Sequence, residues 1–306
     1  MRFITKKVIQ NKAYYYLQYQ NYFKSLGSTL PNNLKEELFS FFQGIGVDRY
    51  KKLPEEIKKE FPFGNLEKVE KLHYKYICLS NSELFQKDFS DFMNLFTVSF
   101  VFNSNRSEGS STDKSDVNKI AASNIRAPKT KTQLEVLNSM MALKYAFNKN
   151  MPWNSKNIKA IHKLLLAGLD DKLIVGKWKN ENNTAPGNQP TTDFAKVDTE
   201  MKKLFDWVNL QFKQRVYPPL LALKFYVKFE SIHPFLDGNG RVGRILLNAI
   251  LFKYRYMPII FFTENHKTHT ECIYQAREGR TKKLHKHFIE QAIKTYKEWL
   301  TPQNET

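Results

Sequence analysis

Cysteines and long apolar runs are what this sequence has least of. Its 306 residues include two cysteines, Cys78 and Cys272, far apart and outside any CxxC spacing. A disulfide framework and a cysteine-based zinc site are therefore not expected. No stretch approaches the roughly 20 consecutive apolar residues of a membrane-spanning helix, and charged residues follow Met1 too soon for a signal peptide. We expect a soluble, cytoplasmic protein without membrane association.

Acidic residues are also scarce. The chain has 30 Asp and Glu against 48 Lys and Arg, which gives a formal net charge of +18. Such a surplus favours anionic partners such as nucleotides, nucleic acid or acidic proteins, although a lysine-rich proteome would produce the same charge. Apolar residues make up 42% of the chain, which is enough for a packed core. The charge alone does not select a function.

The pattern of apolar residues changes early in the chain. An aromatic run, Tyr14–Leu17, and short apolar pairs before it predict a small antiparallel sheet. After Pro31 the apolar residues recur at helical spacing. A charged segment with a proline, 51–64, is the best candidate for a boundary. We predict a small α+β N-terminal module and connector over 1–64, followed by a mainly α domain over 65–306.

The segment from His233 to Arg244 reads HPFLDGNGRVGR. Asp-Gly and Asn-Gly are strong hairpin signals, but helical spacing on both sides favours a helix, a glycine loop and a second helix. Such a loop points unpaired backbone N–H groups at one spot, where they bind phosphate. Gly238 and Gly240 allow a ligand to approach the backbone closely.

The side chains of this segment supply the other parts of a phosphate-transfer site. Arg241 and Arg244 lie three residues apart on one helical face and add donors. Asp237 offers the oxygen ligand that Mg²⁺ accepts beside phosphates. His233 can take up a proton near pH 7. A base, a metal ligand, an anion cradle and two arginines together indicate phosphate-transfer chemistry.

This segment resembles the signature of the Fic (filamentation-induced-by-cAMP) family, His-x-Phe-x-(Asp/Glu)-Gly-Asn-Gly-Arg-x-x-Arg, at every fixed position. A chance match has odds on the order of 10⁻¹⁰ per start site at average residue usage. The resemblance extends from about Phe96 to the C-terminus and implies an all-helical core with a β-hairpin flap. It also implies a protein adenylyltransferase, which transfers AMP from Mg-ATP to a Tyr, Ser or Thr hydroxyl of a target protein and of itself.

The resemblance implies a role for each fixed residue. His233 would be the catalytic base, Asp237 the Mg²⁺ ligand, and Phe235 an anchor that holds the loop. The residues that surround the phosphates would be Gly238, Asn239, Gly240, Arg241 and Arg244. Of these, Arg244 would face the γ-phosphate. The intact Gly-Asn-Gly favours AMP transfer over the phosphorylating Doc-like branch of the family.

A second segment, Ser104–Gly109, resembles the inhibitory motif of the family, (Ser/Thr)-x-x-x-Glu-(Gly/Asn). The pattern is short, and an ordinary helix that stops at a glycine also produces it. Its position supports the inhibitory interpretation, in which Ser104 and Glu108 lie on a helix near 96–109. Glu108 would then compete with the γ-phosphate for Arg244. Ser110 departs from the family, whose members commonly have Asn there.

Two further features follow from the resemblance. Gly176–Val197 resembles the flap, a hairpin that holds the target polypeptide in extended form. Trp178 is followed by Lys179, where relatives often have Arg, so the contacts of the flap are not carried over. Tyr274 is a candidate for stacking on the adenine ring, although a lone aromatic residue on a helix is more often part of the core.

Other features and functions stay open. His266 and His269 have no third ligand at suitable spacing, so a metal site is not expected there, and a basic cluster over 277–287 is usually a solvated face. The ligands that we expect are ATP and Mg²⁺. The alternatives are removal of AMP, transfer of UMP, phosphocholine or another phosphate group, and a basic nucleic-acid-binding regulator with a vestigial Fic loop. The target protein and homo-oligomer formation are not determined by the sequence.

Overall fold

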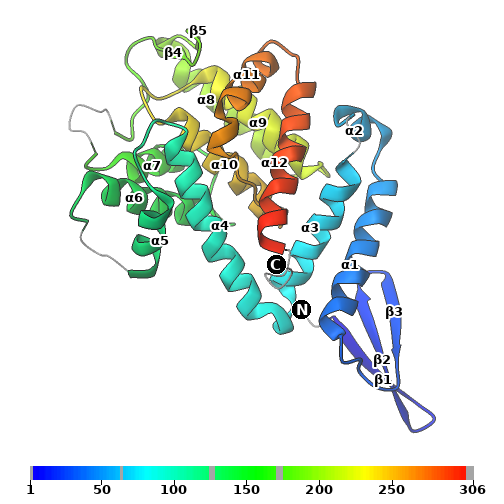
Figure 1. Cartoon of the computed structure of the whole chain (residues 1–306). Helices are drawn as coiled ribbons and strands as arrows, with labels where there is room; N and C mark the ends of the chain where they lie inside the picture. The colour runs from blue at the N-terminus through cyan, green and yellow to red at the C-terminus, as the bar shows by residue number, and fades with distance from the viewer. Residues whose placement is uncertain (1–2, 63–64, 124–127, 170–174, 301–306) are drawn as a thin grey trace. The chain divides into compact units, whose positions relative to one another are not determined.

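The computed structural model describes residues 3–62, 65–123, 128–169 and 175–300. Helices form most of it, and two small antiparallel sheets complete it (Figure 1). The prediction of a mainly helical fold with a flap hairpin and a small α+β start is confirmed. The chain divides into two compact units, Met1–Met93 with Ile293–Thr306 and Asn94–Ala292. The domain boundary near residue 64 stays a prediction.

The first unit begins with a sheet in the order β1-β2-β3. Its elements are β1 (Ile4–Ile9), β2 (Lys12–Tyr19), β3 (Tyr22–Gly27), α1 (Leu34–Lys51), α2 (Glu55–Glu60), α3 (Leu66–Asn81) and η1 (Glu83–Phe85). Gln10 and Asn11 have positive φ and form the first tight turn. Alternation along β2 puts Leu17 on one face of the sheet, where it is fully buried.

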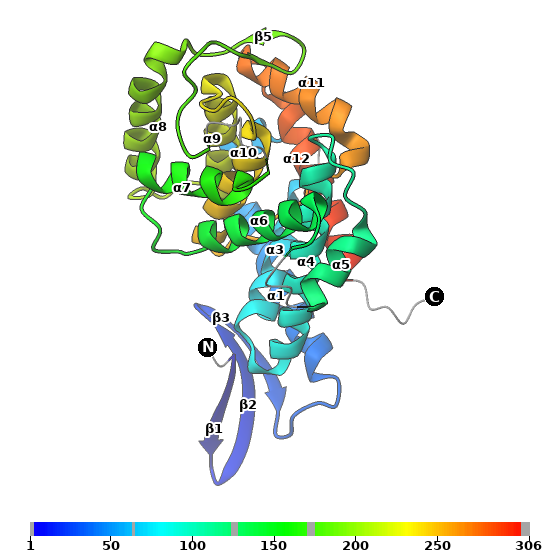
Figure 2. The same cartoon turned by 90° about the vertical axis from the view of Figure 1, so that its left-hand side faces the viewer.

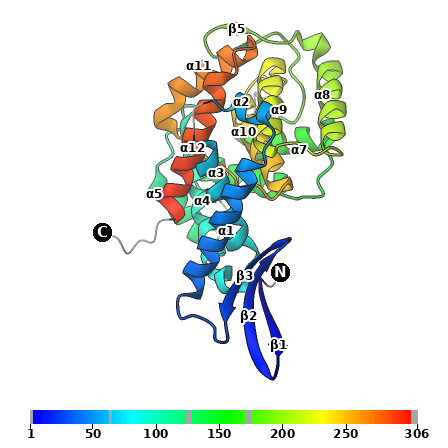
Figure 3. The ribbon, with the colours of Figure 1, turned by 90° about the vertical axis from the view of Figure 1, so that its right-hand side faces the viewer.

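Helix α1 lies beside this sheet (Figure 3). The rings of Phe3 and Tyr19 lie 4.8 and 5.0 Å from the ring of Phe42 on α1, measured between centroids. Gly46 lets α1 and α3 approach closely, because a Cβ there would lie 2.8 Å from the carbonyl oxygen of Glu70. This small aromatic core joins the sheet and the two helices.

The second unit begins inside α4 and ends inside α12. The elements from there on are α4 (Gln86–Arg106), α5 (Lys114–Ser123), α6 (Lys131–Ala146), α7 (Ser155–Leu166), β4 (Thr184–Ala185), β5 (Gln189–Pro190), η2 (Phe194–Lys196), α8 (Val197–Gln211), α9 (Pro218–Ile232), α10 (Asn239–Lys253), η3 (Thr263–Asn265), α11 (His266–Arg277) and α12 (Lys282–Leu300). Strands β4 and β5 form the short antiparallel hairpin expected of the flap.

Helices α9 and α10 form the centre of the second unit (Figure 2). Helix α9 packs against α8, α10 and α11, and prolines occupy its first positions, where the missing N–H is not needed. Every residue from Arg241 to Leu251 on α10 is buried, as in a helix that lies inside a core. The loop between α9 and α10 therefore stands on a rigid support. Among the described residues, no helix is both long and apolar enough to cross a membrane.

Candidate active site

The loop between α9 and α10 is shaped from within by its asparagine. Helix α9 ends at His233 in a left-handed conformation (φ 50°, ψ 62°), and Gly238 takes a second one just before α10. The Asn239 side chain accepts a hydrogen bond from the Phe235 N–H (2.9 Å) and donates one to the Phe235 carbonyl (2.7 Å). Asn239 therefore fixes the loop with its side chain, while its backbone N–H belongs to the first turn of α10.

Phe235 anchors this loop through a histidine on α7. Its buried ring stacks on His162, with centroids 3.8 Å apart and planes 3° apart. His162 Nε2 donates to the Asp237 carbonyl (3.1 Å), since Nδ1 already accepts from the Gly176 N–H (2.9 Å). Burial lowers the pKa of His162 to about 4, so the ring is neutral at pH 7 and this tautomer is kept.

Arg244 is held through Nε and Nη2 by the segment that resembles the inhibitory motif. Its Nη2 donates to Glu108 Oε1 (2.8 Å) and to the Ser104 carbonyl (2.9 Å), and its Nε donates to Ser104 Oγ (3.1 Å). Only 4% of the Arg244 side chain is exposed, against 24% for Glu108. Burial alone would raise the pKa of Glu108, but the charge of Arg244 and its hydrogen bond outweigh it and lower that pKa. Glu108 is therefore ionised and paired.

Gly240 makes this pairing sterically feasible. A Cβ at this position would lie 2.4 Å from Glu108 Oε1 and 3.0 Å from Arg244 Nη1. Glu108 thus approaches Arg244 as expected. The helix that leads to it, however, ends earlier than predicted. Helix α4 ends at Arg106, and Glu108 lies in the turn that follows, before Gly109 at φ 85°. The left-handed glycine turns the chain back and leaves the carboxylate at the arginine.

Arg241 is held between two carboxylates. Its Nη2 donates to Asp237 Oδ2 (3.0 Å) and its Nη1 donates to Glu135 Oε1 on α6 (3.2 Å). The other oxygen of Glu135 accepts from the Ser110 hydroxyl (2.6 Å). Ser110, the departure from the family motif, therefore takes part in the ion-pair network of the loop through Glu135.

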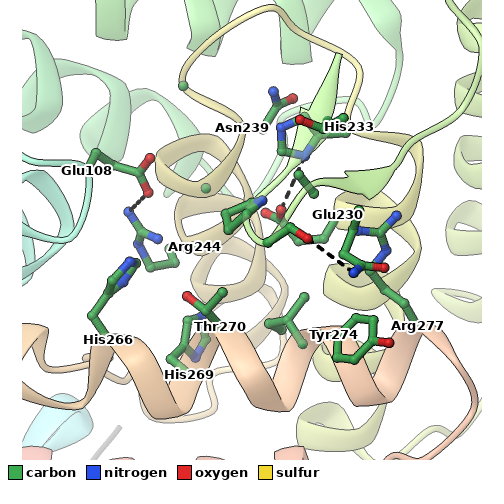
Figure 4. Close-up of a pocket in the computed structure, with 18 of the residues that line it drawn as sticks. Glu108, Glu230, His233, Asn239, Arg244, His266, His269, Thr270, Tyr274 and Arg277 are labelled. Atoms are coloured by element: carbon green, nitrogen blue, oxygen red, sulfur yellow. Dashed lines mark hydrogen bonds and ion pairs between the residues drawn. The ribbon is translucent and has the colours of Figure 1, made fainter. Parts of the chain in front are cut away.

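A cleft of about 400 Å³ opens above the loop, within the range of small-molecule sites. Figure 4 shows Glu108 and Arg244 at one end and Tyr274 and Arg277 of α11 at the other. His233 lines the cleft and is 8% exposed. The flap residues that line it are Thr184, Ala185, Pro186, Gly187, Asn188 and Gln189. Arg277 donates a hydrogen bond to the Pro190 carbonyl and so ties α11 to the flap.

A buried lysine holds the base of the flap. Lys179 is 3% exposed, and its Nζ donates to Asn183 Oδ1 (2.8 Å) and Thr191 Oγ1 (2.7 Å). Its N–H donates to the Pro234 carbonyl (2.8 Å). Burial lowers the pKa of Lys179 to about 8, and Asp193 opposes that shift. Lys179 thus connects both arms of the flap to the loop that carries His233.

The residues of the cleft fit a Mg²⁺ ion that is bound together with nucleotide phosphates. No group of three or more His, Cys, Asp or Glu that could hold a metal occurs in the described part of the chain. Asp237, whose side chain is 47% exposed, lines the cleft. Mg²⁺ in nucleotide sites needs only one or two carboxylates beside phosphates and waters. A single aspartate is therefore sufficient, provided that it exchanges its bond to Arg241 for the ion.

Most of the candidate site residues line this one cleft, whereas Ser104 and Arg241 contact the lining residues Arg244 and Asp237. The structure also adds residues that the sequence did not point to. Tyr274 lines the cleft, and its stacking on adenine stays a prediction. His162, Glu135 and Glu230 were missed because no motif contains them and the sequence does not say which loop residue each one meets. A buried polar residue facing the core side of a helix is the one signal that could have marked them, but it does not say which partner it meets.

Comparison with known proteins agrees with these features. Residues 152–251 match the model of the Fic/DOC family. Protein adenylyltransferase Fic from Drosophila willistoni is 27% identical over 148 residues, 47% of this chain and 29% of that protein. The Drosophila virilis protein of the same name is 26% identical over 47% of this chain and 30% of its own length. The chain spans less than a third of these relatives' length.

Solved structures share the fold. A Fic domain containing signaling protein from Bacteroides thetaiotaomicron has a TM-score of 0.66 at 20% identity, covering 75% of this chain and 94% of its own. Fic-1 from C. elegans has a TM-score of 0.67 at 19% identity, covering 88% of this chain and 84% of its own. At such identities the likeness concerns the fold alone.

Proposed function

Because residues 152–251 form a domain of the Fic/DOC family, we propose that this protein is a protein adenylyltransferase. It transfers AMP from Mg-ATP to a Tyr, Ser or Thr hydroxyl of a target protein and of itself. The observation that carries the proposal is the loop, where a histidine, a helix N-terminus and two arginines meet at one cleft of suitable size. The curated relatives that match are named protein adenylyltransferase.

The proposed reaction uses the residues of the loop in turn. His233 takes the proton of the attacking hydroxyl, whose oxygen forms a bond to the α-phosphorus as the bond to the β-phosphate oxygen breaks and pyrophosphate leaves. The backbone N–H groups at Gly238, Asn239 and Gly240 stabilise the charge that develops on the phosphoryl oxygens. Magnesium bound at Asp237 would neutralise phosphate charge.

The remaining residues orient the nucleotide. Arg241 and Arg244 grip the phosphates as planar, multidentate donors, and Tyr274 stacks on the adenine. The flap, which lines the same cleft, presents the hydroxyl-bearing segment of the target. Arg244, Tyr274 and the flap residues 184–189 line the cleft, and Arg241 donates a hydrogen bond to Asp237, which also lines it.

Self-inhibition by Glu108 is the second part of the proposal. Nε and Nη2 of Arg244 already donate to Ser104 and Glu108, so these donors are not free for the γ-phosphate, and ATP binds in an unproductive pose. The pair is partly buried and charge-assisted. We therefore expect Glu108 to disfavour the productive contact between Arg244 and the γ-phosphate by about 2 to 3 kcal/mol. Each 1.36 kcal/mol is tenfold in rate, so relief of inhibition amounts to roughly 30- to 150-fold.

A labelling experiment tests this function. Wild type, Glu108→Gly and Glu108→Asp are incubated with α-³²P-ATP or γ-³²P-ATP and Mg²⁺, alone and with a lysate. We expect Glu108→Gly to incorporate the α-label roughly 30- to 150-fold faster than wild type, and Glu108→Asp to fall between them because the shorter side chain keeps its charge.

The other outcomes separate the alternatives. Incorporation of the γ-label would show phosphorylation, and label from α-³²P-UTP would show UMP transfer. Loss of label from modified protein when wild type is added would show AMP removal. No label in any variant would leave a vestigial loop and refute the proposed function. Equal labelling by Glu108→Gly and wild type would refute self-inhibition alone.

A further inference from the structure

Glu230 is a buried acid beside the catalytic loop that the family signature does not contain. It lies on the last turn of α9, is 6% exposed and lines the cleft. Its Oε1 has no hydrogen-bond partner among the described residues, and the same holds for Nδ1 of His233. Unpaired buried polar atoms are costly. Two of them on one turn of a helix indicate a function rather than packing.

These two side chains face one another. Glu230 Oε2 lies 3.6 Å from His233 Nδ1, and Figure 4 shows the contact at the wall of the cleft. The left-handed backbone of His233 ends the helix there, so the imidazole turns back over the last turn of α9. The distance is too long for a hydrogen bond, but such bonds in free enzymes often tighten only when the substrate is bound.

The surroundings leave room for the Glu230 carboxylate and place positive charge near it. A Cβ on Gly243 would lie 2.6 Å from Glu230 Oε1 and 2.7 Å from the ring of Tyr226, so only a glycine on α10 leaves room. The charged or titratable neighbours that interact with Glu230 are Tyr226 of α9, Arg244 of α10 and Arg277 of α11. The flap residues of the cleft, 184–189, are uncharged. Two arginines thus place positive charge near the Glu230 carboxylate.

We propose that Glu230 is a positioning residue for His233. Its carboxylate accepts the Nδ1–H of the imidazole and so keeps the tautomer whose free Nε2 faces the attacking hydroxyl. When the hydroxyl proton moves to Nε2, the imidazolium that forms is paired with the Glu230 carboxylate. This role rests on the proposed transfer reaction, in which the same proton is removed as the bond to the α-phosphorus forms.

The test measures His233 apart from activity. In Glu108→Gly protein carrying ¹³Cε1-labelled histidine, the NMR resonance of His233, assigned through His233→Ala, is titrated with and without Glu230→Gln. An opposite charge at this range moves a titration by about one pH unit or more. We therefore expect the titration midpoint of the His233 resonance to fall by about one pH unit in Glu230→Gln. The acid limb of the pH–rate profile should move to lower pH by the same amount. At pH 7 AMP transfer should fall by about tenfold or more.

Two companion variants keep the test decisive. Glu230→Asp retains the charge and should recover part of the midpoint shift and of the rate. Glu271→Gln removes an exposed acid of α11 and should leave both at the parent values. An unchanged midpoint in folded Glu230→Gln would overturn the positioning role, whatever the rate. If the Glu108→Gly parent transfers no AMP, the proposed function fails, while the NMR titration still decides whether Glu230 acts on His233.

Discussion

The catalytic loop and the flap face the same cleft but are built in different ways. In the loop, Asn239, Arg241 and Arg244 each use their side chain on a specific partner, and the helix behind them is buried. The flap has strands of two residues each, and Lys179 is its main polar tie. The proposed functions fit this difference: phosphoryl chemistry at the loop would need fixed atoms, whereas a flap that receives varied polypeptides would need mainly an exposed strand edge.

This comparison predicts that changes in the loop have large effects and changes in the flap small ones. The largest effect is expected for His233→Ala. Removal of a general base typically costs about 10²- to 10⁴-fold in rate, whereas ATP affinity should change by less than about threefold, since the imidazole acts on the hydroxyl. AMP transfer and ATP binding, measured by calorimetry on the Glu108→Gly background, check this. Full transfer by His233→Ala would show that the base lies elsewhere.

The second effect concerns Asp237. Asp237→Ala should raise the Mg²⁺ concentration for half-maximal activity by about tenfold, because the ion loses its proposed protein ligand but keeps phosphates and waters. Asp237→Glu is the matched control, since it retains a carboxylate and should stay near wild type. A magnesium titration of AMP transfer measures both. Coincident curves for Asp237→Ala and wild type would remove Asp237 from the metal site.

The same contrast explains what could be predicted from the sequence. The loop was recognisable because its chemistry demands particular residues at fixed spacing, and the mainly α fold followed from apolar spacing along α9 and α10. The exact end of α4 was not predictable, because the turn that carries Glu108 depends on Gly109 and on contacts with Arg244. Glu135 and Ser110 could not be paired in advance, because their contact joins segments 25 residues apart.

The flap shows what could not be predicted from the sequence. The family resemblance implied a hairpin over 176–197, and it marked Lys179 only as a departure from the Arg that relatives often have. In the structure this lysine bonds to residues 4 and 12 positions further along the chain. Such a bond depends on how the arms of the hairpin meet, and no local pattern encodes that.

The smallest effect is expected for the lysine of the flap, and it appears in stability rather than in catalysis. Burial lowers the pKa of Lys179 to about 8 in the folded protein, whereas an unfolded lysine has a pKa of about 10.4. Between these values the unfolded chain binds more protons than the folded one, so stability rises with pH. Below about pH 8 both states are charged, and above about pH 10.4 both are neutral, so the contribution is then constant.

Lys179→Arg is the variant that isolates this effect. Arginine keeps hydrogen-bond donors at the position but does not lose its proton in this range. A buried titration contributes at most about 1.4 kcal/mol per pH unit. We therefore expect the Tm of wild type, minus that of Lys179→Arg, to rise by roughly 2 °C per pH unit between about pH 8 and 10. Every other alkaline titration is common to both proteins and cancels in the difference. A constant difference between the two Tm values over this range would mean that Lys179 does not titrate in the folded protein. The flap would then be held by a fixed charge, as the loop is.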